Sequence, residues 1–250
     1  MTKLVGATPV FYDVLATTDY QPNFEALEQS DLSKVKLMWV SYPHMPTGAK
    51  ASKSTFEKLI TFGKKHNILI VNDNPYSFIL NESPQSILEI EGAKDIALEL
   101  NSLSKTFNMA GWRVGMLLGN KYFISEILKV KTQQDSGMFY GVQTAAIAAL
   151  NTSKEWIEQQ NLAYNKRRLL AWKLADNLNC TYSRDSAGLF VWAKLPEGKT
   201  SEKVIDTLLL EKHIFAAPGT IFGTNGEGYI RFSLCVSEHD IKEALKRVSL

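Results

Sequence analysis

The sequence predicts an α/β fold, in which a larger domain with a mostly parallel sheet is followed by a smaller α+β domain. Residues 68–71, Ile-Leu-Ile-Val, are fully apolar, as is typical of a strand whose sheet is covered on both faces. Residues 96–100 alternate between apolar and smaller or more polar side chains, which favours a second strand. A long amphipathic stretch at 154–178 precedes a change to shorter elements. We therefore expect a larger domain at 1–153, a bridging helix at 154–178 and a smaller domain at 179–250.

The remaining elements of the larger domain follow from local patterns. The expected elements are a short strand at 9–12, one or two helical turns at 24–28, a buried strand at 35–41, a helix from 54 to about 65, a surface helix at 121–131 and a helix of small residues at 142–150. The helix from 54 is predicted because Ser54 and Glu57 have the spacing of a capping box.

The smaller domain is predicted to contain a strand at 189–195, a helix at 201–212 and a second strand at 229–234. Ser237 to Asp240 is expected to cap a final helix. The glycines of 223–228 resemble a dinucleotide-binding loop, but the pattern of a following helix is missing, so we interpret them as a turn.

Composition excludes several classes of function. The 250 residues carry a formal net charge of +2, which favours neither a nucleic acid nor an anionic membrane as partner. The two cysteines and four histidines show no metal-ligand spacing. The sequence also contains no transmembrane-length apolar run, so we expect a cytoplasmic protein without a metal.

Lys105 is the first candidate for chemistry. It closes the polar turn 101–105, Asn-Ser-Leu-Ser-Lys, directly after the strand expected at 96–100. A lysine amine can attack a carbonyl once it has lost its proton, and a nearby cation such as Arg113 would favour that loss. An isolated Ser-Lys pair is more often a solvated turn, so the case rests on the longer string around it.

That string, Ser-Leu-Ser-Lys-Thr-Phe-Asn-Met-Ala-Gly-Trp-Arg-Val-Gly at 102–115, closely resembles the cofactor-lysine motif of class I/II aminotransferases. These are fold-type I enzymes of pyridoxal 5′-phosphate (PLP). The resemblance implies a three-layer PLP-transferase large domain and an internal aldimine between Lys105 and PLP. It also implies that Ser102, Ser104 and Arg113 hold the cofactor phosphate, a role for which hydroxyls and a guanidinium are suited.

Two further motifs follow in the family order. Asp73 and Tyr76 come after the apolar strand 68–71, and the resemblance assigns Asp73 to the pyridine nitrogen and Tyr76 to the phenolic oxygen of PLP. In the strand 229–234, Arg231 shares one face with a tyrosine and a serine, which predicts a hydroxyl-lined surface. The resemblance implies that Arg231 binds the substrate's α-carboxylate.

The loop 42–48, Tyr-Pro-His-Met-Pro-Thr-Gly, resembles the family's Asn-Pro-Thr-Gly loop but departs from it. Met45 stands where the family normally has an asparagine that donates a hydrogen bond to the phenolic oxygen, and methionine has no such donor. We expect either a raised aldimine pKa or replacement of the donor by His44 or Tyr76.

The implied function is transamination between an L-amino acid and a 2-oxo acid, with Lys105 as the Schiff-base lysine, in amino acid metabolism or biosynthesis. A homodimer is implied as well. The phrase at 135–146 is similar to the subgroup of aspartate, alanine and LL-diaminopimelate aminotransferases. Because the family carries a phosphate turn and a ring-stacking aromatic before the point where this chain starts, we expect an N-terminally truncated sequence.

Two alternatives remain open. The first is another fold-type I PLP reaction, such as that of a lyase, decarboxylase or synthase, because fold does not determine chemistry. The second is a non-catalytic fragment of an aminotransferase that binds PLP weakly and does not turn over. The sequence does not name the amino acid.

Overall fold

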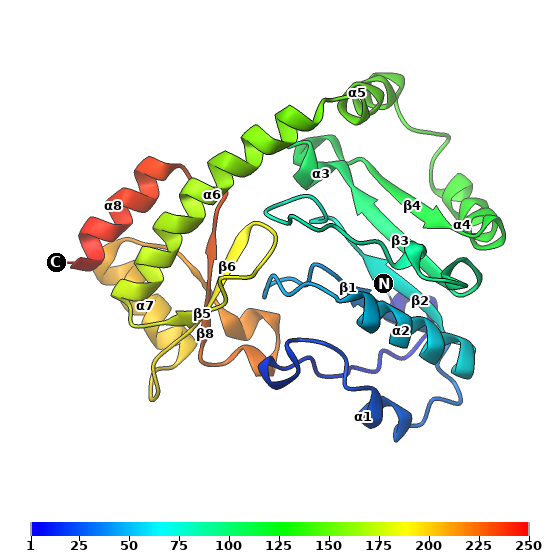
Figure 1. Ribbon diagram of the computed structural model, residues 1–250, viewed down its shortest axis with the longest axis horizontal. Helices are drawn as coiled ribbons and strands as arrows, with labels where there is room; N and C mark the ends of the chain where they lie inside the picture. The colour runs from blue at the N-terminus through cyan, green and yellow to red at the C-terminus, as the bar shows by residue number, and fades with distance from the viewer. Residues whose placement is uncertain (1, 250) are drawn as a thin grey trace.

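Four strands in the N-terminal half form the first sheet of the computed structural model, which describes residues 2–249 (Figure 1). They are β1 (Leu37–Ser41), β2 (Leu69–Asp73), β3 (Ala97–Ser102) and β4 (Gly115–Gly119). The strand order is β1-β2-β3-β4; the first three are parallel, and β4 is antiparallel to β3. The mostly parallel sheet predicted from the sequence is therefore confirmed.

Helix α2 (Lys53–His66) covers one face of this sheet, and its buried side chains include Phe56, Leu59 and Ile60. Its N-cap is Ser52, whose side chain accepts a hydrogen bond from the Thr55 backbone at 3.0 Å. The capping box predicted at Ser54 is therefore wrong by two residues, because the serine that precedes the first helical turn is the one in extended conformation.

The short strand predicted at 9–12 does not form. The segment follows the surface without a ladder partner, and the local pairing is a single antiparallel bridge between Val14 and Pro22. Tyr12 instead donates a hydrogen bond from its hydroxyl to the Trp39 carbonyl at 2.6 Å. An apolar pattern of four residues does not determine pairing when no neighbouring edge is in register.

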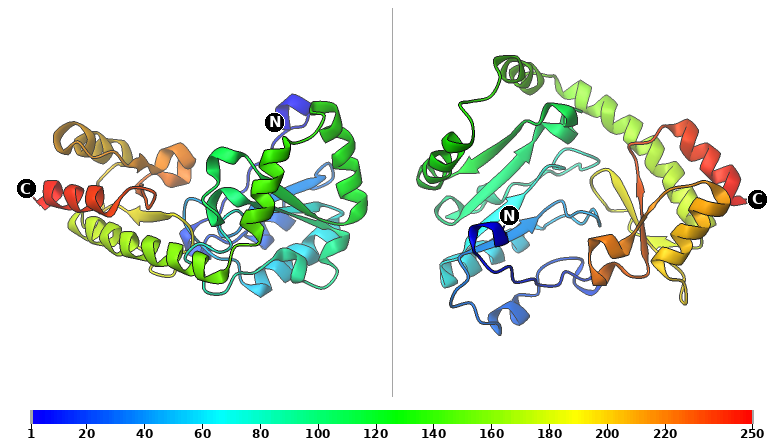
Figure 2. Two further views of the ribbon diagram at one scale, coloured as in Figure 1. Left: turned by 90° about the horizontal axis from the view of Figure 1, so that it is seen from above. Right: turned by 180° about the vertical axis from the view of Figure 1, so that it is seen from behind.

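The other α-helices that precede α6 are α1 (Phe24–Glu28), α3 (Leu103–Thr106), α4 (Lys121–Gln134) and α5 (Tyr140–Leu150). Helix α6 (Lys154–Asn177) then runs from the first sheet to the C-terminal part of the molecule, as two views show (Figures 1 and 2).

The C-terminal part is built on an antiparallel sheet of order β5-β6-β8-β7. Its elements are β5 (Thr181–Tyr182), β6 (Phe190–Lys194), α7 (Ser201–Lys212), β7 (Ala217–Pro218), β8 (Tyr229–Ser233) and α8 (Glu238–Ser249). The side chains of Ile230 and Phe232 are buried against α6, α7 and α8. Ser237 caps α8 by accepting a hydrogen bond from the Asp240 backbone at 3.1 Å, as predicted.

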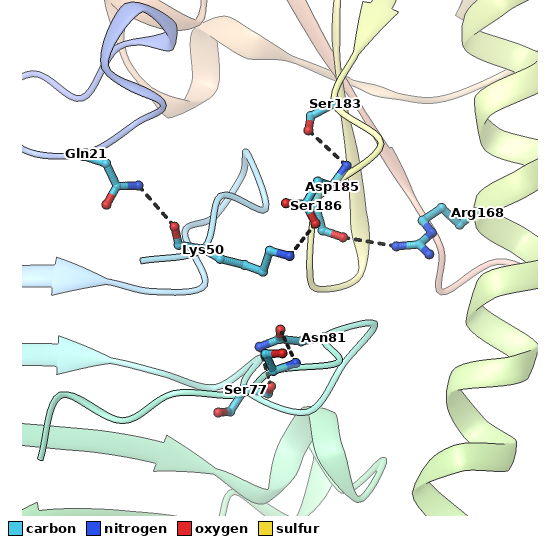
Figure 3. Close-up of polar contacts among 9 residues, drawn as sticks. Gln21, Lys50, Ser77, Asn81, Arg168, Ser183, Asp185 and Ser186 are labelled. Atoms are coloured by element: carbon cyan, nitrogen blue, oxygen red, sulfur yellow. Dashed lines mark hydrogen bonds and ion pairs between the residues drawn. The ribbon is translucent and has the colours of Figure 1, made fainter. Parts of the chain in front are cut away.

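The loop 183–188, which links β5 to β6, contacts the loops that follow β1 and β2, and Figure 3 shows its ion pair with Lys50. The Ala187 N–H donates to the Gly48 carbonyl at 2.8 Å, and the Gly188 N–H donates to the Ile79 carbonyl at 2.8 Å. Lys50 forms an ion pair with Asp185. These contacts hold the C-terminal part of the molecule against the loops at the edge of the first sheet.

None of the helices between residues 2 and 249 has the length and apolar character needed to cross a lipid bilayer. Across the same residues, no cluster of three or more His, Cys, Asp or Glu side chains is arranged to hold a metal ion.

Candidate active site

Asp73 lies at the C-terminal end of β2, at the edge where α/β sheets bind ligands. A buried network fixes this edge. Asn72 accepts a hydrogen bond from the Tyr42 N–H at 3.0 Å and donates one to the Glu99 carboxylate at 3.0 Å. Glu99 also accepts from a hydroxyl and an N–H of residues 86–87. The network therefore joins β2 and β3 to the start of the loop 42–48. Solvent reaches Asp73, yet partial burial raises the pKa of its carboxyl.

Lys105 lies on α3, the short helix that follows β3. Ser102 caps this helix, because its hydroxyl accepts the Ser104 N–H at 3.1 Å. The same hydroxyl donates to the Val114 carbonyl at 3.4 Å, which ties α3 to the start of β4. Lys105 Nζ lies 5.9 Å from the centre of the Tyr76 ring.

Tyr76 connects the residues from the two sheets. Its side chain is buried, its ring centre lies 6.2 Å from that of Phe190, and burial raises the pKa of its hydroxyl. The charges of Arg231 and Asp73 are close enough to act on this pKa as well, the first lowering it and the second raising it. Asp73, Tyr76, Lys105 and Arg231 therefore surround one region between the sheets.

Arg231 lies on β8, on the face opposite the buried Ile230 and Phe232. Tyr229 and Ser233 share this face, as predicted, but the sequence did not predict the phenyl rings that contact the guanidinium: its carbon lies 4.0 Å from the centre of the Phe190 ring and 4.5 Å from that of Phe222. Burial lowers the pKa of Arg231. Its Nε atom is buried and has no hydrogen-bond partner among the described residues.

Arg113 and Ser104 lie close to Lys105 in the chain. Ser104 is buried, whereas Arg113 is exposed and in the left-handed backbone region, with φ of 54°. Arg113 donates from Nη1 to the Ala110 carbonyl at 2.9 Å, which leaves other donors of the guanidinium for a ligand.

Met45 and His44 lie in the loop that Asn72 supports. The Met45 methyl group lies beside Gly188, where a Cβ atom would be 2.5 Å away, and the same position is 3.6 Å from the Tyr76 ring. His44 Nδ1 is within hydrogen-bond distance of the Thr47 hydroxyl, at 2.8 Å, and burial lowers the pKa of the imidazole to about 4. Nδ1 of His44 is therefore engaged by Thr47, whereas the Tyr76 hydroxyl forms no hydrogen bond with the described residues.

Four polar groups in this region share one property. Within residues 2–249, the Asp73 carboxylate, Tyr76 hydroxyl, Lys105 amine and Arg231 guanidinium form no ion pair or side-chain hydrogen bond with the protein. Tyr76, Lys105 and Arg231 are buried or partly buried, and such groups are normally paired, so an unpaired set beside the exposed Asp73 points to a ligand. An amine, a carboxylate, a phenol and a guanidinium fit the carbonyl, ring nitrogen and phenolic oxygen of PLP and the carboxylate of an amino acid.

Sequence reasoning missed Phe190 and Phe222 as neighbours of Arg231. Phe190 lies on β6, and Phe222 ends the 3₁₀ turn η6 (Gly219–Phe222). The sequence did show that Phe222 directly precedes the glycines of 223–228, but the contact of Phe190 with Arg231 depends on the pairing of β6 with β8.

Comparison with known proteins determines the family. The family model for aminotransferase class I and II matches residues 1–248. The chain belongs to the class I and II aminotransferases. It is 39% identical over 250 residues to an LL-diaminopimelate aminotransferase of Dehalococcoides mccartyi, and 38% identical over 245 residues to one of Aquifex aeolicus.

Solved aminotransferase structures have the same fold. The apo structure of BacF from Bacillus subtilis superposes with a TM-score of 0.91 at 34% identity, and an aminotransferase from Staphylococcus aureus with 0.90 at 35% identity. Each match covers 99% of this aminotransferase chain. The chain spans 64% of the D. mccartyi relative, 64% of the BacF chain and 66% of the S. aureus chain. The α/β fold with a second, smaller sheet agrees with these relatives.

Proposed function

We propose that this aminotransferase chain binds PLP through Lys105 and transfers an amino group between an L-amino acid and a 2-oxo acid. The observation that supports it is the set of four unpaired polar groups around Tyr76, in a chain of the aminotransferase family. The larger domain at 1–153 would hold the cofactor, and the smaller one at 179–250 would supply Arg231. The helix at 154–178 joins them.

Each residue has a separate task in this proposal. Lys105 supplies the amine that binds the cofactor's carbonyl carbon and later moves the proton from the substrate's Cα. Asp73 holds a proton on the ring nitrogen, and Tyr76 donates to the phenolic oxygen. Bound PLP supplies the electron sink for the reaction. Ser102, Ser104 and Arg113 are proposed to hold the cofactor phosphate.

Arg231 is proposed to bind the α-carboxylate of the amino acid. It carries a positive charge, and the described residues give it no carboxylate partner, which favours an anionic ligand. A cation at this point stabilises the substrate's carboxylate, so we favour amino-group transfer over loss of that carboxylate as CO₂.

The relatives guide the choice of substrate. The relatives from D. mccartyi and A. aeolicus are named LL-diaminopimelate aminotransferases, so we propose a donor with a second carboxylate, and LL-diaminopimelate is the first to test. We also propose a cytoplasmic homodimer, since dimers are common in fold-type I enzymes.

A spectral titration tests this function. The purified chain is saturated with PLP, amino acids are added singly, and the visible absorbance of the bound cofactor is followed. We expect LL-diaminopimelate to deplete the band and a 2-oxo acid to restore it. Lys105→Ala should abolish both changes, whereas Lys58→Ala, at an exposed site on α2, should not.

Arg231→Lys should raise the donor concentration needed for half depletion at least about tenfold, because lysine loses the bidentate geometry. A band that forms and does not respond to any amino acid would contradict transamination and favour a non-catalytic fragment. Release of CO₂, or of a fragment of the amino acid side chain, would favour a decarboxylase or lyase.

A further inference from the structure

The two phenyl rings of Phe190 and Phe222, here called the Arg231 clamp, contact one guanidinium from two separate elements. Phe190 belongs to β6 and Phe222 to η6, and their ring centres lie 4.0 Å and 4.5 Å from the Arg231 guanidinium carbon. Contacts of this kind attract the cation but use none of its N–H donors. The clamp therefore holds the guanidinium while leaving its hydrogen bonds for another molecule.

Strand register brings the first ring to Arg231. Trp192 is directly opposite Arg231 in the β6–β8 pair, and Phe190 is opposite Ser233. Phe190 is thus the diagonal neighbour of Arg231 on the same face of the sheet, within reach of a long side chain.

Two glycines place the second ring. A Cβ atom on Gly219 would lie only 2.0 Å from the Gly226 carbonyl oxygen, so η6 and the next turn, η7 (Thr224–Gly226), approach as closely as backbone allows. This approach holds η6 beside β8. Phe222 also packs edge-on against Trp192, with ring centres 5.8 Å apart. The position of the Phe222 ring is consequently fixed by the backbone and by Trp192.

The clamp leaves Arg231 with a defined direction for a ligand. The Nε atom is buried and unpartnered, so the terminal N–H groups are the donors open to an anion. Phenyl rings offer no hydrogen bond to an oxygen that approaches them. An anion with both acceptors in the guanidinium plane is satisfied there, whereas an oxygen outside that plane loses water and gains no partner.

We propose that the Arg231 clamp makes this site selective for planar carboxylates over tetrahedral oxyanions such as sulfonates and phosphonates. A carboxylate can lie in the guanidinium plane with two parallel hydrogen bonds. A sulfonate of the same charge carries a third oxygen, which lies outside that plane and finds no hydrogen-bond donor on a phenyl ring. The inference rests on the proposed function, since it explains how the amino acid's carboxylate is recognised.

The test is an NMR titration of the full chain, with and without PLP, using three probes that share an ethyl group: propionate, ethanesulfonate and ethylphosphonate. The readouts are the backbone amides of 229–233 and the Trp192 indole N–H. We expect propionate to bind at least about tenfold more tightly than ethanesulfonate. Ethylphosphonate carries a higher negative charge than propionate, so charge alone would favour it at a guanidinium without the clamp. At the Arg231 clamp we expect it to bind more weakly than propionate.

Phe222→Leu is the diagnostic variant, since the side chain is 40% exposed and its truncation leaves little cavity. We expect propionate binding to weaken about fivefold and the preference over ethanesulfonate to fall to within about twofold. Phe222→Tyr keeps a ring and should retain the preference. Phe215→Leu, at an exposed phenylalanine in the segment before β7, is the matched control and should match the unmodified chain.

Equal binding of the three probes by the unmodified chain would overturn the proposal, as would an undiminished preference in Phe222→Leu. A chain that keeps the carboxylate preference but does not bond PLP through Lys105 would refute the proposed function and leave the clamp inference standing. A chain that transaminates without the preference would refute the clamp alone.

Discussion

Removing the Asn72 side chain is expected to destabilise the fold strongly, although Asn72 is not proposed to touch substrate or cofactor. The side chain is fully buried and makes two hydrogen bonds, one from the Tyr42 N–H and one to the Glu99 carboxylate, both at 3.0 Å. Asn72→Ala leaves the buried N–H without an acceptor and the carboxylate without one of its donors. An orphaned buried group costs about 1–3 kcal/mol, and bonds to charged groups are at the upper end.

We therefore expect Asn72→Ala to lower the free energy of unfolding by about 3 kcal/mol, measured by urea denaturation followed by circular dichroism. Asn151→Ala is the control, because the exposed Asn151 side-chain amide bonds, among residues 2–249, only to the Ile147 carbonyl at the end of its own helix. We expect a loss below about 0.5 kcal/mol. A loss under about 1 kcal/mol for Asn72→Ala, with an unchanged denaturant slope, would refute the role given to this network.

Three further predictions concern the same region. Gly48→Ala should lower the free energy of unfolding by at least about 2 kcal/mol, because φ is +74° and the new Cβ would lie 2.7 Å from the Ala187 carbonyl oxygen. The control Gly198→Ala, with φ of +77° and open space around the new Cβ, should lower it by about 1 kcal/mol. Equal losses in urea denaturation would contradict a steric role for the close approach of Gly48 to Ala187. Burial lowers the pKa of His44 from 6.5 to about 4, so the folded state is fully stabilised by the neutral imidazole above pH 6.5 and loses that stabilisation as pH falls toward 4. The free energy of unfolding should fall by about 3 kcal/mol over this range, as measured by urea denaturation. The pH dependence should disappear in His44→Asn. The raised pKa of Asp73 means that ionisation disfavours the folded state as pH rises past 3.8, so Asp73→Asn should raise the urea midpoint of the PLP-free chain at pH 7 but not at pH 3; a lower midpoint at pH 7 would contradict this.

The sequence predicted a site residue best where a strand visible in the local pattern also determines where that residue lies. The apolar run at 68–71 predicted a buried parallel strand, and Asp73 follows from it as the residue at the strand's end. Lys105 likewise follows from the alternating strand before it, although the strand extends to Ser102 and Lys105 itself is on a short helix. Local periodicity determines such features because neighbours in the chain provide the pattern.

Features that depend on partners distant in sequence were not predictable. The rings around Arg231 require the register of β6 with β8 and the close approach of two turns, and neither leaves a local signature. The buried Glu99 was invisible for the same reason, since its hydrogen-bond donors come from two segments distant from it in the chain, residue 72 and residues 86–87. The strand predicted at 9–12 was wrong because strand formation depends on an available neighbour more than on composition.

Borohydride reduction of the PLP-treated chain, followed by peptide mass spectrometry, tests the central claim most directly. Reduction makes the bond between the cofactor's carbonyl carbon and an amine permanent, so the mass shift identifies the lysine that formed it. We predict a visible absorbance band before reduction and a single modified peptide that contains Lys105. Modification of another lysine, or a folded chain with no modified peptide, would contradict the assignment of Lys105 as the cofactor-binding residue.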